Sequence, residues 1–447
     1  MKISFYNIGC KVNFAEMSQI QEQFIELGYS VVDFQAESDI ILINTCTVTH
    51  NADADCRKII HRAKKISPDA FIGVMGCYSQ LNPGEIAEIE GVDAIFGIED
   101  KYHIPELIQN YSRKDEPHIF ISDNKTIPFH TACSIDNESH TRAVLKIQDG
   151  CDYYCSYCIV PYARGECRSM DFEELKNTIL KFSETKVYEI ILSGINLGEY
   201  EASTGENFLD VIKFISQLNI QTKISNYNSE PRIQNSELPM RFRISSIEPN
   251  LLSNEIINIV QTSKNICPHF HIPLQSGSPE ILKLMHRRYK VEKFKDLIYE
   301  IKEKIPDCCI GVDVITGFPG ETDLHFKETY ELIKSLPISY LHVFTYSERK
   351  GTKAFDLDGK VNPHVRKERT KLLRMLSELK KAEFYKSQIG SIRTVIPEVY
   401  DSITGLWNGW TENYIRVKFA GKNNLGHHPI KVRLDKLDGE YVSGISK

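Results

Sequence analysis

The sequence of 447 residues has no hydrophobic run that approaches the length of a membrane span, which needs about 20 apolar residues in succession. Residues 1–7 have the pattern of a β-strand rather than that of a signal peptide. With 41% hydrophobic and 26% charged residues, the chain has an ordinary composition for a soluble protein of two or three domains. We therefore expect a cytoplasmic protein with no membrane partner.

The sequence also lacks an excess of positive charge. Its 54 Lys and Arg residues are outnumbered by 60 Asp and Glu residues, which gives a formal net charge of −6. A protein that binds nucleic acid through most of its surface is usually basic. Any RNA-binding site in this chain must therefore be a local patch.

Cysteine, in contrast, occurs twelve times. Disulfides are rare in the reducing cytoplasm, so metal binding, chemistry or burial explains these thiols better. Three of them lie within eight residues: Cys151, Cys155 and Cys158. One loop with this spacing can place three thiolates around a metal centre, and thiolates select zinc, copper(I) or iron–sulfur clusters.

Zinc and unligated thiols are the alternatives at this loop. Zinc normally needs a fourth ligand, and Cys167 lies nine residues beyond Cys158 instead of forming the second close pair of a zinc ribbon. A three-cysteine iron–sulfur cluster fits the spacing better, because it keeps one iron open for a small chelating ligand.

The C-x3-C-x2-C pattern of this loop, with Tyr157 directly before the last cysteine, resembles the radical S-adenosylmethionine (radical SAM) superfamily. The resemblance implies a [4Fe-4S] cluster whose open iron is chelated by the amino and carboxylate groups of SAM. It also implies reductive cleavage of SAM to a 5′-deoxyadenosyl radical, which abstracts hydrogen from an unactivated carbon.

The first 125 residues alternate short β-rich runs with amphipathic stretches, which predicts an open α/β domain with a parallel sheet. The runs are 3–8, 40–44 and 71–75, and the stretches are 16–27, 54–65 and 85–89. A cysteine follows each run: Cys10, Cys46 and Cys77. Since the carboxyl ends of parallel strands share one edge, the fold would bring these thiols together, although buried structural thiols are an equal alternative on position alone.

The residues around these cysteines favour a second cluster. The segments 9–13, 44–48 and 76–80 each resemble the N-terminal domain of the methylthiotransferases. The resemblance implies that Cys10, Cys46 and Cys77 hold an auxiliary [4Fe-4S] cluster. Cys56 and Cys133 match no motif, and we interpret them as structural.

A polar linker is expected at 126–142, with one short strand before it at 118–121. Six strand-like runs then alternate with helical stretches across 143–383: 144–148, 189–192, 242–246, 269–272, 310–315 and 340–344. This pattern predicts a partial, open (β/α)6 barrel, in which the chemistry lies at the carboxyl ends of the strands.

Polar residues at these expected strand ends form the candidate SAM site. The superfamily resemblance implies that backbone at Ser193 and Gly194 binds the SAM amino group and that 311–317 passes under the adenine. For any single residue, a hydrogen-bonded structural role is as good an explanation. The expected cofactor contacts are Tyr157, Ser193, Gly194, Ser246, Glu248, His271, Gln275, Asp313 and Thr316.

The last part of the chain combines a basic helix with short strands. Residues 363–386 contain eight Lys or Arg and three Glu, which usually indicates a solvated helix face. Residues 384–447 predict a small β-barrel with nine Lys or Arg against six Asp or Glu. With Trp407 and Trp410 as exposed aromatic residues, it would bind RNA, and it loosely resembles a TRAM domain.

Nearly the whole chain resembles the radical SAM methylthiotransferase family. The resemblance implies that one SAM methylates sulfur on the auxiliary cluster and a second generates the radical. The segments 9–13, 161–165 and 243–249 are most similar to the branch that modifies C2 of N6-threonylcarbamoyladenosine, 3′ of the tRNA anticodon. Alternatives are the branches for isopentenyladenosine and for a ribosomal-protein aspartate, and a non-catalytic iron–sulfur protein that binds tRNA or transfers electrons.

The expected partners are tRNA, a one-electron donor of flavodoxin or ferredoxin type, and a sulfur donor. Because the threonylcarbamoyl group carries a carboxylate, its pocket should contain a basic residue. The candidates are Arg164, Arg168, Arg349 and Lys350, which could equally bind phosphate or face solvent. The family pattern is broken at Glu166, where a basic residue is expected.

Overall fold

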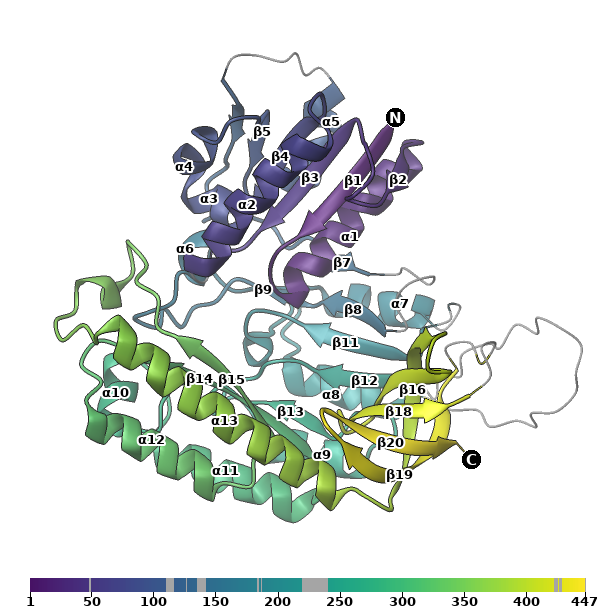
Figure 1. Ribbon diagram of the computed structural model, residues 1–447, viewed down its shortest axis with the longest axis vertical. Coiled ribbons are helices and arrows are strands. Elements are labelled where there is room, and N and C mark those ends of the chain that lie inside the picture. The colour runs from purple at the N-terminus through teal and green to yellow at the C-terminus, as the bar shows by residue number, and fades with distance from the viewer. Residues whose placement is uncertain are drawn as a thin grey trace, which may run out of the picture.

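The computed structural model describes residues 1–47, 50–109, 116–125, 127–134, 142–182, 185, 187–218, 240–421, 425 and 428–446. Figure 1 shows an N-terminal α/β unit at the top, a central α/β barrel below it and a small β-barrel beside the central one. The predicted fold class is confirmed. No helix in the described ranges is long and apolar enough to cross a membrane.

The N-terminal sheet is parallel throughout, with strand order β2-β1-β3-β4-β5-β6. Its strands are β1 Lys2–Asn7, β2 Ser30–Val32, β3 Ile40–Thr45, β4 Phe71–Gly76, β5 Ala94–Phe96 and β6 His118–Phe120. Its helices are α1 Lys11–Glu26, α2 His50–Ile66, α3 Cys77–Leu81, α4 Pro83–Ala87, η1 Asp100–His103 and α5 Ile104–Gln109. The strand expected near His118 is the outer strand of this sheet.

Alternation along β3 explains why helices cover both faces of the sheet. Ile41 and Ile43 pack into the core formed with α2, whereas Ile40 and Leu42 pack into the core formed with α1. Successive side chains of a strand point to opposite faces. An unbroken apolar run is therefore required in a strand that is buried on both sides.

The central barrel has six parallel strands, as predicted. β12-β11-β8 and β13-β14-β15 form two ladders, and the isolated bridges Phe242–Ile266 and Ser246–His271 connect them. The strands are β8 Arg142–Lys146, β11 Glu189–Ser193, β12 Arg241–Ile244, β13 His269–His271, β14 Cys309–Thr316 and β15 Tyr340–Thr345. The main helices around them are α7 Phe172–Phe182, α8 Phe208–Gln217, α9 Asn254–Thr262, α10 Pro279–Leu284, α11 Val291–Lys304, α12 Asp323–Ser335 and α13 Pro363–Ser387.

Three smaller elements complete this part. β7 (Ala132–Cys133) pairs antiparallel with β8, so part of the expected linker is an additional strand of the barrel sheet. Residues 126 and 135–141 of that linker lie outside the described residues. β9 (Gln148–Asp149) and β10 (Arg168–Ser169) form a short antiparallel pair, and α6 (Val160–Arg164) lies between them in the chain.

The small barrel is closed by β16 Ile392–Asp401, β17 Leu406–Thr411, β18 Arg416–Ala420, β19 Ile430–Asp438 and β20 Tyr441–Ser446. It is anchored to β12, because Arg241 and Arg243 donate to carbonyl oxygens of Thr394 and Thr411 at 3.0 and 3.2 Å. The expectation of exposed tryptophans is wrong for Trp407, which is buried in the barrel core. Its indole fills the space that closure of so small a barrel leaves.

The expectation of a solvated basic face on α13 is only partly right. Arg366, Arg369 and Lys380 are buried against the central barrel. Arg366 pairs with Glu348 at 2.7 Å, and Arg369 pairs with Glu321 at 2.5 Å. These side chains attach the helix to the barrel, so charge counting alone does not identify the face that meets solvent.

Candidate functional site

The loop that carries Cys151, Cys155 and Cys158, here called the loop triad, is fixed at its base. The Cys151 amide donates to the Gly165 carbonyl oxygen at 3.2 Å. Gly150 has a φ of +68°, and a Cβ there would lie 1.8 Å from the Glu166 carbonyl oxygen. Only glycine permits this close approach of the backbone.

Backbone bonds also hold the middle of the loop. The Cys158 amide donates to the Cys155 carbonyl oxygen at 2.9 Å. Ser156 donates through its amide to Met285 O at 3.1 Å and accepts from the Ala354 amide at 2.7 Å. The three thiols are therefore positioned by backbone from distant parts of the barrel.

Arg287 joins three of the residues named from the sequence. Its Nη1 donates to the Cys155 sulfur at 3.1 Å and to the Tyr157 hydroxyl at 3.5 Å, and its Nη2 pairs with Glu248. Burial raises the pKa of the Cys158 thiol to about 12. A buried guanidinium beside these sulfurs would stabilise negative charge on them.

Gln148 organises the segment expected to bind the SAM amino group. Its Oε1 accepts from the amides of Ile195 and Asn196, both at 2.8 Å, directly after Ser193 and Gly194. Its Nε2 donates to the Gly150 carbonyl oxygen at 2.8 Å. Sequence reasoning missed Gln148 and Arg287, because neither stands in a motif and only the fold brings each to its partners.

Other expected SAM contacts lie at the ends of β12 to β14. His271 Nε2 lies 2.8 Å from Asp313 Oδ1, and Ser246 forms a backbone bridge with His271. The buried Gln275 Oε1 and Ser245 Oγ have no hydrogen-bond partner in the described part of the chain. Unsatisfied buried polar atoms are rare in folded proteins, so this mouth of the barrel fits a polar ligand.

Thr316 is the exception among the expected SAM contacts. Its hydroxyl lies 2.7 Å from Thr370 Oγ1 of α13 and is buried. The side chain therefore faces the surrounding helix layer rather than the interior of the barrel. The sequence placed it correctly at a strand end, but alternation along β14 turns it outward.

The second group of thiols, Cys10, Cys46 and Cys77, is here called the sheet triad. Each follows one of three neighbouring strands, β1, β3 and β4. Cys10 is the N-cap of α1 and Cys77 is the first residue of α3. A Cβ added at Gly9 would lie 3.3 Å from Cys46 Cβ. Burial raises the pKa of the Cys77 thiol.

The two triads lie on elements that touch. Cys77 and Ala163 belong to one cluster of buried side chains. Ala163 is part of α6, which begins two residues after Cys158. The helix that leaves the loop triad therefore packs on the helix that begins with Cys77.

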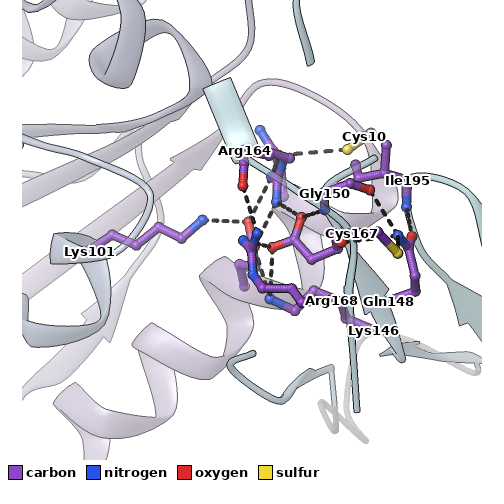
Figure 2. A network of polar contacts seen from close by, with 12 residues as sticks. Cys10, Lys101, Lys146, Gln148, Gly150, Arg164, Cys167, Arg168 and Ile195 are labelled. Atoms are coloured by element: carbon purple, nitrogen blue, oxygen red, sulfur yellow. Dashed lines mark hydrogen bonds and ion pairs between the residues drawn. The ribbon is translucent and has the colours of Figure 1, made fainter. Parts of the chain in front are cut away.

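A buried ion network strengthens this contact (Figure 2). Arg164 of α6 donates to Glu16 at 3.0 Å and to Asp149 at 2.8 Å. It also donates to Asn13 at 2.6 Å, within the first turn of the helix that Cys10 caps. Lys101 and Lys146 donate to the same Glu16 carboxylate at 2.6 and 3.1 Å.

This network also decides among the four candidates for substrate binding. Arg164 is fully buried and its guanidinium is occupied, which contradicts a role in binding substrate. Arg168 is held by Asp149 at 2.8 Å. Arg349 and Lys350 instead line a cavity between the N-terminal unit and the barrel.

The remaining cysteines have other partners, and the Cys56 thiol donates to the Cys46 carbonyl oxygen at 3.7 Å. Cys167 contacts Gln148 Nε2 and the Glu199 carbonyl oxygen through its sulfur, each at 3.3 Å. Cys56 and Cys133 are buried in two different apolar cores. None of the twelve cysteines, all of which are described, forms a disulfide.

Comparisons with known proteins agree with this arrangement. The model of the radical SAM superfamily matches residues 145–333, and that of "uncharacterized protein family UPF0004" matches residues 2–97. The chain is 36% identical to the threonylcarbamoyladenosine tRNA methylthiotransferase MtaB of Bacillus subtilis, over 99% of this chain and 95% of the relative. The chain belongs to the methylthiotransferase family.

Other members of the family are similar over comparable lengths. The MtaB of Aquifex aeolicus is 33% identical over 95% of this chain and 98% of its own. The tRNA-2-methylthio-N6-dimethylallyladenosine synthase of Clostridium tetani is 30% identical over 97% and 95%. Among solved structures, the radical SAM methyltransferase TsrM of Kitasatospora setae aligns over 79% of this chain and 77% of its own, with a TM-score of 0.55 and 13% identity, which shows a shared fold.

Radical SAM membership implies a [4Fe-4S] cluster and SAM, and the residues present fit both. The loop triad offers three thiol ligands on a fixed loop. Unpartnered polar atoms remain where SAM is expected.

Proposed function

We propose that this protein is a tRNA methylthiotransferase that modifies C2 of N6-threonylcarbamoyladenosine. The observation that carries the proposal is the contact between the two cysteine triads through α3 and α6. The names of the full-length relatives supply the substrate.

The chain's residues divide the work between two sites. The loop triad would hold the radical SAM cluster, and the sheet triad would hold an auxiliary [4Fe-4S] cluster. When bound, these groups and SAM supply the methyl group, the sulfur and the 5′-deoxyadenosyl radical. The Arg287 guanidinium places a positive charge beside the Cys155 sulfur. The Gln148 side chain accepts a hydrogen bond from the Ile195 amide and so fixes the turn that follows Gly194.

Packing of α6 on α3 holds the helix that follows the loop triad against the helix that begins with Cys77. Positioning of this kind is a large part of what a protein adds to a reaction between bound groups. A flavodoxin- or ferredoxin-type donor would supply the electron, and a separate donor would replace the sulfur.

The small barrel would supply tRNA affinity. Arg416 and Lys418 on β18 lie over the Tyr441 ring at 4.6 and 3.9 Å, and both are partly exposed. Basic side chains with an aromatic platform suit single-stranded RNA. This surface replaces Trp407 as the expected RNA contact.

Competition between two tRNAs tests the substrate. The reduced, cluster-reconstituted protein should add the methylthio group to threonylcarbamoylated tRNA and leave isopentenylated tRNA unchanged, as read by nucleoside mass spectrometry. The opposite result would assign the protein to the second branch, whose members are also about 30% identical to it. Binding of tRNA without cleavage of SAM would indicate a non-catalytic protein.

A further inference from the structure

A cavity of about 550 Å³ lies between the N-terminal unit and the central barrel. Its lining includes Thr47, which directly follows Cys46, and Ile159, which directly follows Cys158. Asp53 from α2 and the segment Glu348–Gly351 after β15 line it too. The cavity therefore adjoins one cysteine of each triad.

Arg349, which lines this cavity, has unused hydrogen-bond donors. The residue is 7% exposed, and its Nη1 pairs with Asp53. Its Nε and Nη2 are buried and have no hydrogen-bond partner in the part of the chain that the structure describes. Leaving two charged N–H groups buried and unpaired is costly, so a ligand is expected to complete them.

The positions of these two nitrogens define the ligand. Nε and Nη2 share one edge of the planar guanidinium, and this edge donates two parallel bonds to a carboxylate or a phosphate. Asp53 accepts only from Nη1, which lies outside this edge.

The other charges around the cavity do not compete for this edge. Asp53 also accepts from Thr47 Oγ1 at 2.8 Å, Glu85 accepts from Tyr78 at 2.8 Å, and Glu348 pairs with Arg366. Arg57 is directed to the Tyr78 hydroxyl at 3.0 Å. Exposed Lys350 adds a second cation at the rim.

We propose that the Nε–Nη2 edge of Arg349, assisted by Lys350, binds an oxyanion of the tRNA substrate between the two cysteine triads. The oxyanion is the carboxylate of the modified adenosine or a backbone phosphate beside it. This inference rests on the proposed function.

Two substitutions of Arg349 and one control test the site. R349Q removes the charge, and R349K keeps the charge but lacks the planar edge. R369Q is the matched control, because Arg369 is equally buried and ion-paired but lies outside the cavity. Each variant is reconstituted and examined for iron content, SAM cleavage without tRNA, and the Kd for threonylcarbamoylated tRNA and for the same tRNA with unmodified adenosine.

R349Q should keep its iron and its SAM cleavage and lose at least about tenfold in tRNA affinity, the effect of one charge-assisted hydrogen bond. R349K should lose most of that affinity, and R369Q should lose none. A loss confined to threonylcarbamoylated tRNA identifies the carboxylate. An equal loss on both tRNAs, with a salt slope lowered by about one, identifies a phosphate.

Three results would overturn the inference: R349Q binding both tRNAs like the unchanged protein, R349K binding like the unchanged protein, or R349Q losing iron or SAM cleavage. The proposed function is judged separately. Turnover of threonylcarbamoylated tRNA by the unchanged protein tests that function, whatever the Arg349 variants do.

Discussion

The two cysteine triads are assembled by opposite routes. The loop triad comes from eight consecutive residues, and its geometry depends on backbone bonds near the barrel mouth. The sheet triad is collected from three strands, and its geometry depends on the order β1-β3-β4. The thiols of the first are close in sequence and are fixed by backbone contacts with Met285 and Ala354, whereas the thiols of the second come together only when a whole sheet has formed. Damage to packing should therefore affect the sheet triad first.

Removing the triads one at a time should have the largest effect. Replacing Cys151, Cys155 and Cys158 with Ala should abolish SAM cleavage and leave roughly half of the iron, because two [4Fe-4S] clusters would each hold the same number of irons. Replacing Cys10, Cys46 and Cys77 should spare SAM cleavage and stop methylthio transfer. Iron analysis and detection of 5′-deoxyadenosine check both, and loss of all iron from either folded variant would contradict two independent sites.

Arg164→Met should show which triad depends on the buried network. Removing this guanidinium leaves Glu16 and Asp149 short of a cation in the interior, which costs about 3–5 kcal/mol of unfolding free energy. Urea unfolding measures the loss. R168M is the control, because Arg168 is less buried and contacts only Asp149 among the carboxylates; it should lose clearly less. Iron should leave the sheet triad before it leaves the loop triad. If both triads keep their iron, Arg164 does not position either of them.

The small barrel should separate tRNA affinity from both triads. R416E together with K418E should weaken tRNA binding and lower its salt slope by about two, since two phosphate contacts are lost. SAM cleavage should not change, because both residues lie on β18 of the small barrel, which is separate from α3 and α6 (Figure 1). Filter binding at several salt concentrations measures the slope, and an unchanged slope would place tRNA elsewhere.

The pH dependence of stability should give the smallest effect. Burial alone would raise the pKa of Glu16, but Arg164, Lys101 and Lys146 hold it well below its usual value. A carboxyl whose pKa is lowered by folding stabilises the protein above its unfolded pKa of about 4.3, and this stability is lost as pH falls through the folded pKa. The free energy of unfolding should therefore fall less steeply below about pH 4.5 in E16Q than in the unchanged protein. The measurement is the urea midpoint of both proteins as a function of pH. If the two midpoints fall equally below about pH 4.5, the prediction is wrong.

Much of the fold could be predicted because buried strands and helices require apolar residues at regular positions, and these positions are visible in the sequence. The runs that became β3, β4, β11 and β14 are mostly apolar and almost entirely buried, as expected for strands covered on both faces. The short strands β2, β5 and β7 were missed, since so few residues often carry too little periodicity, although β6 and β13 were found at three residues each. β20 was missed as well, because its run ends in small and polar residues.

The candidate site divides in the same way. Sequence by itself determined which cysteines belong together, because the spacing of one triad and the strand-end positions of the other can be read from the chain. Only the tertiary structure decided the roles of the basic residues. Nothing in the sequence distinguishes three of the arginines. In the structure Arg164 is paired with two buried carboxylates, Arg287 lies against a cysteine sulfur, and Arg349 has one edge of its guanidinium unpaired. A guanidinium takes its function from the partners that surround it, and partners more than a hundred residues away become neighbours only on folding.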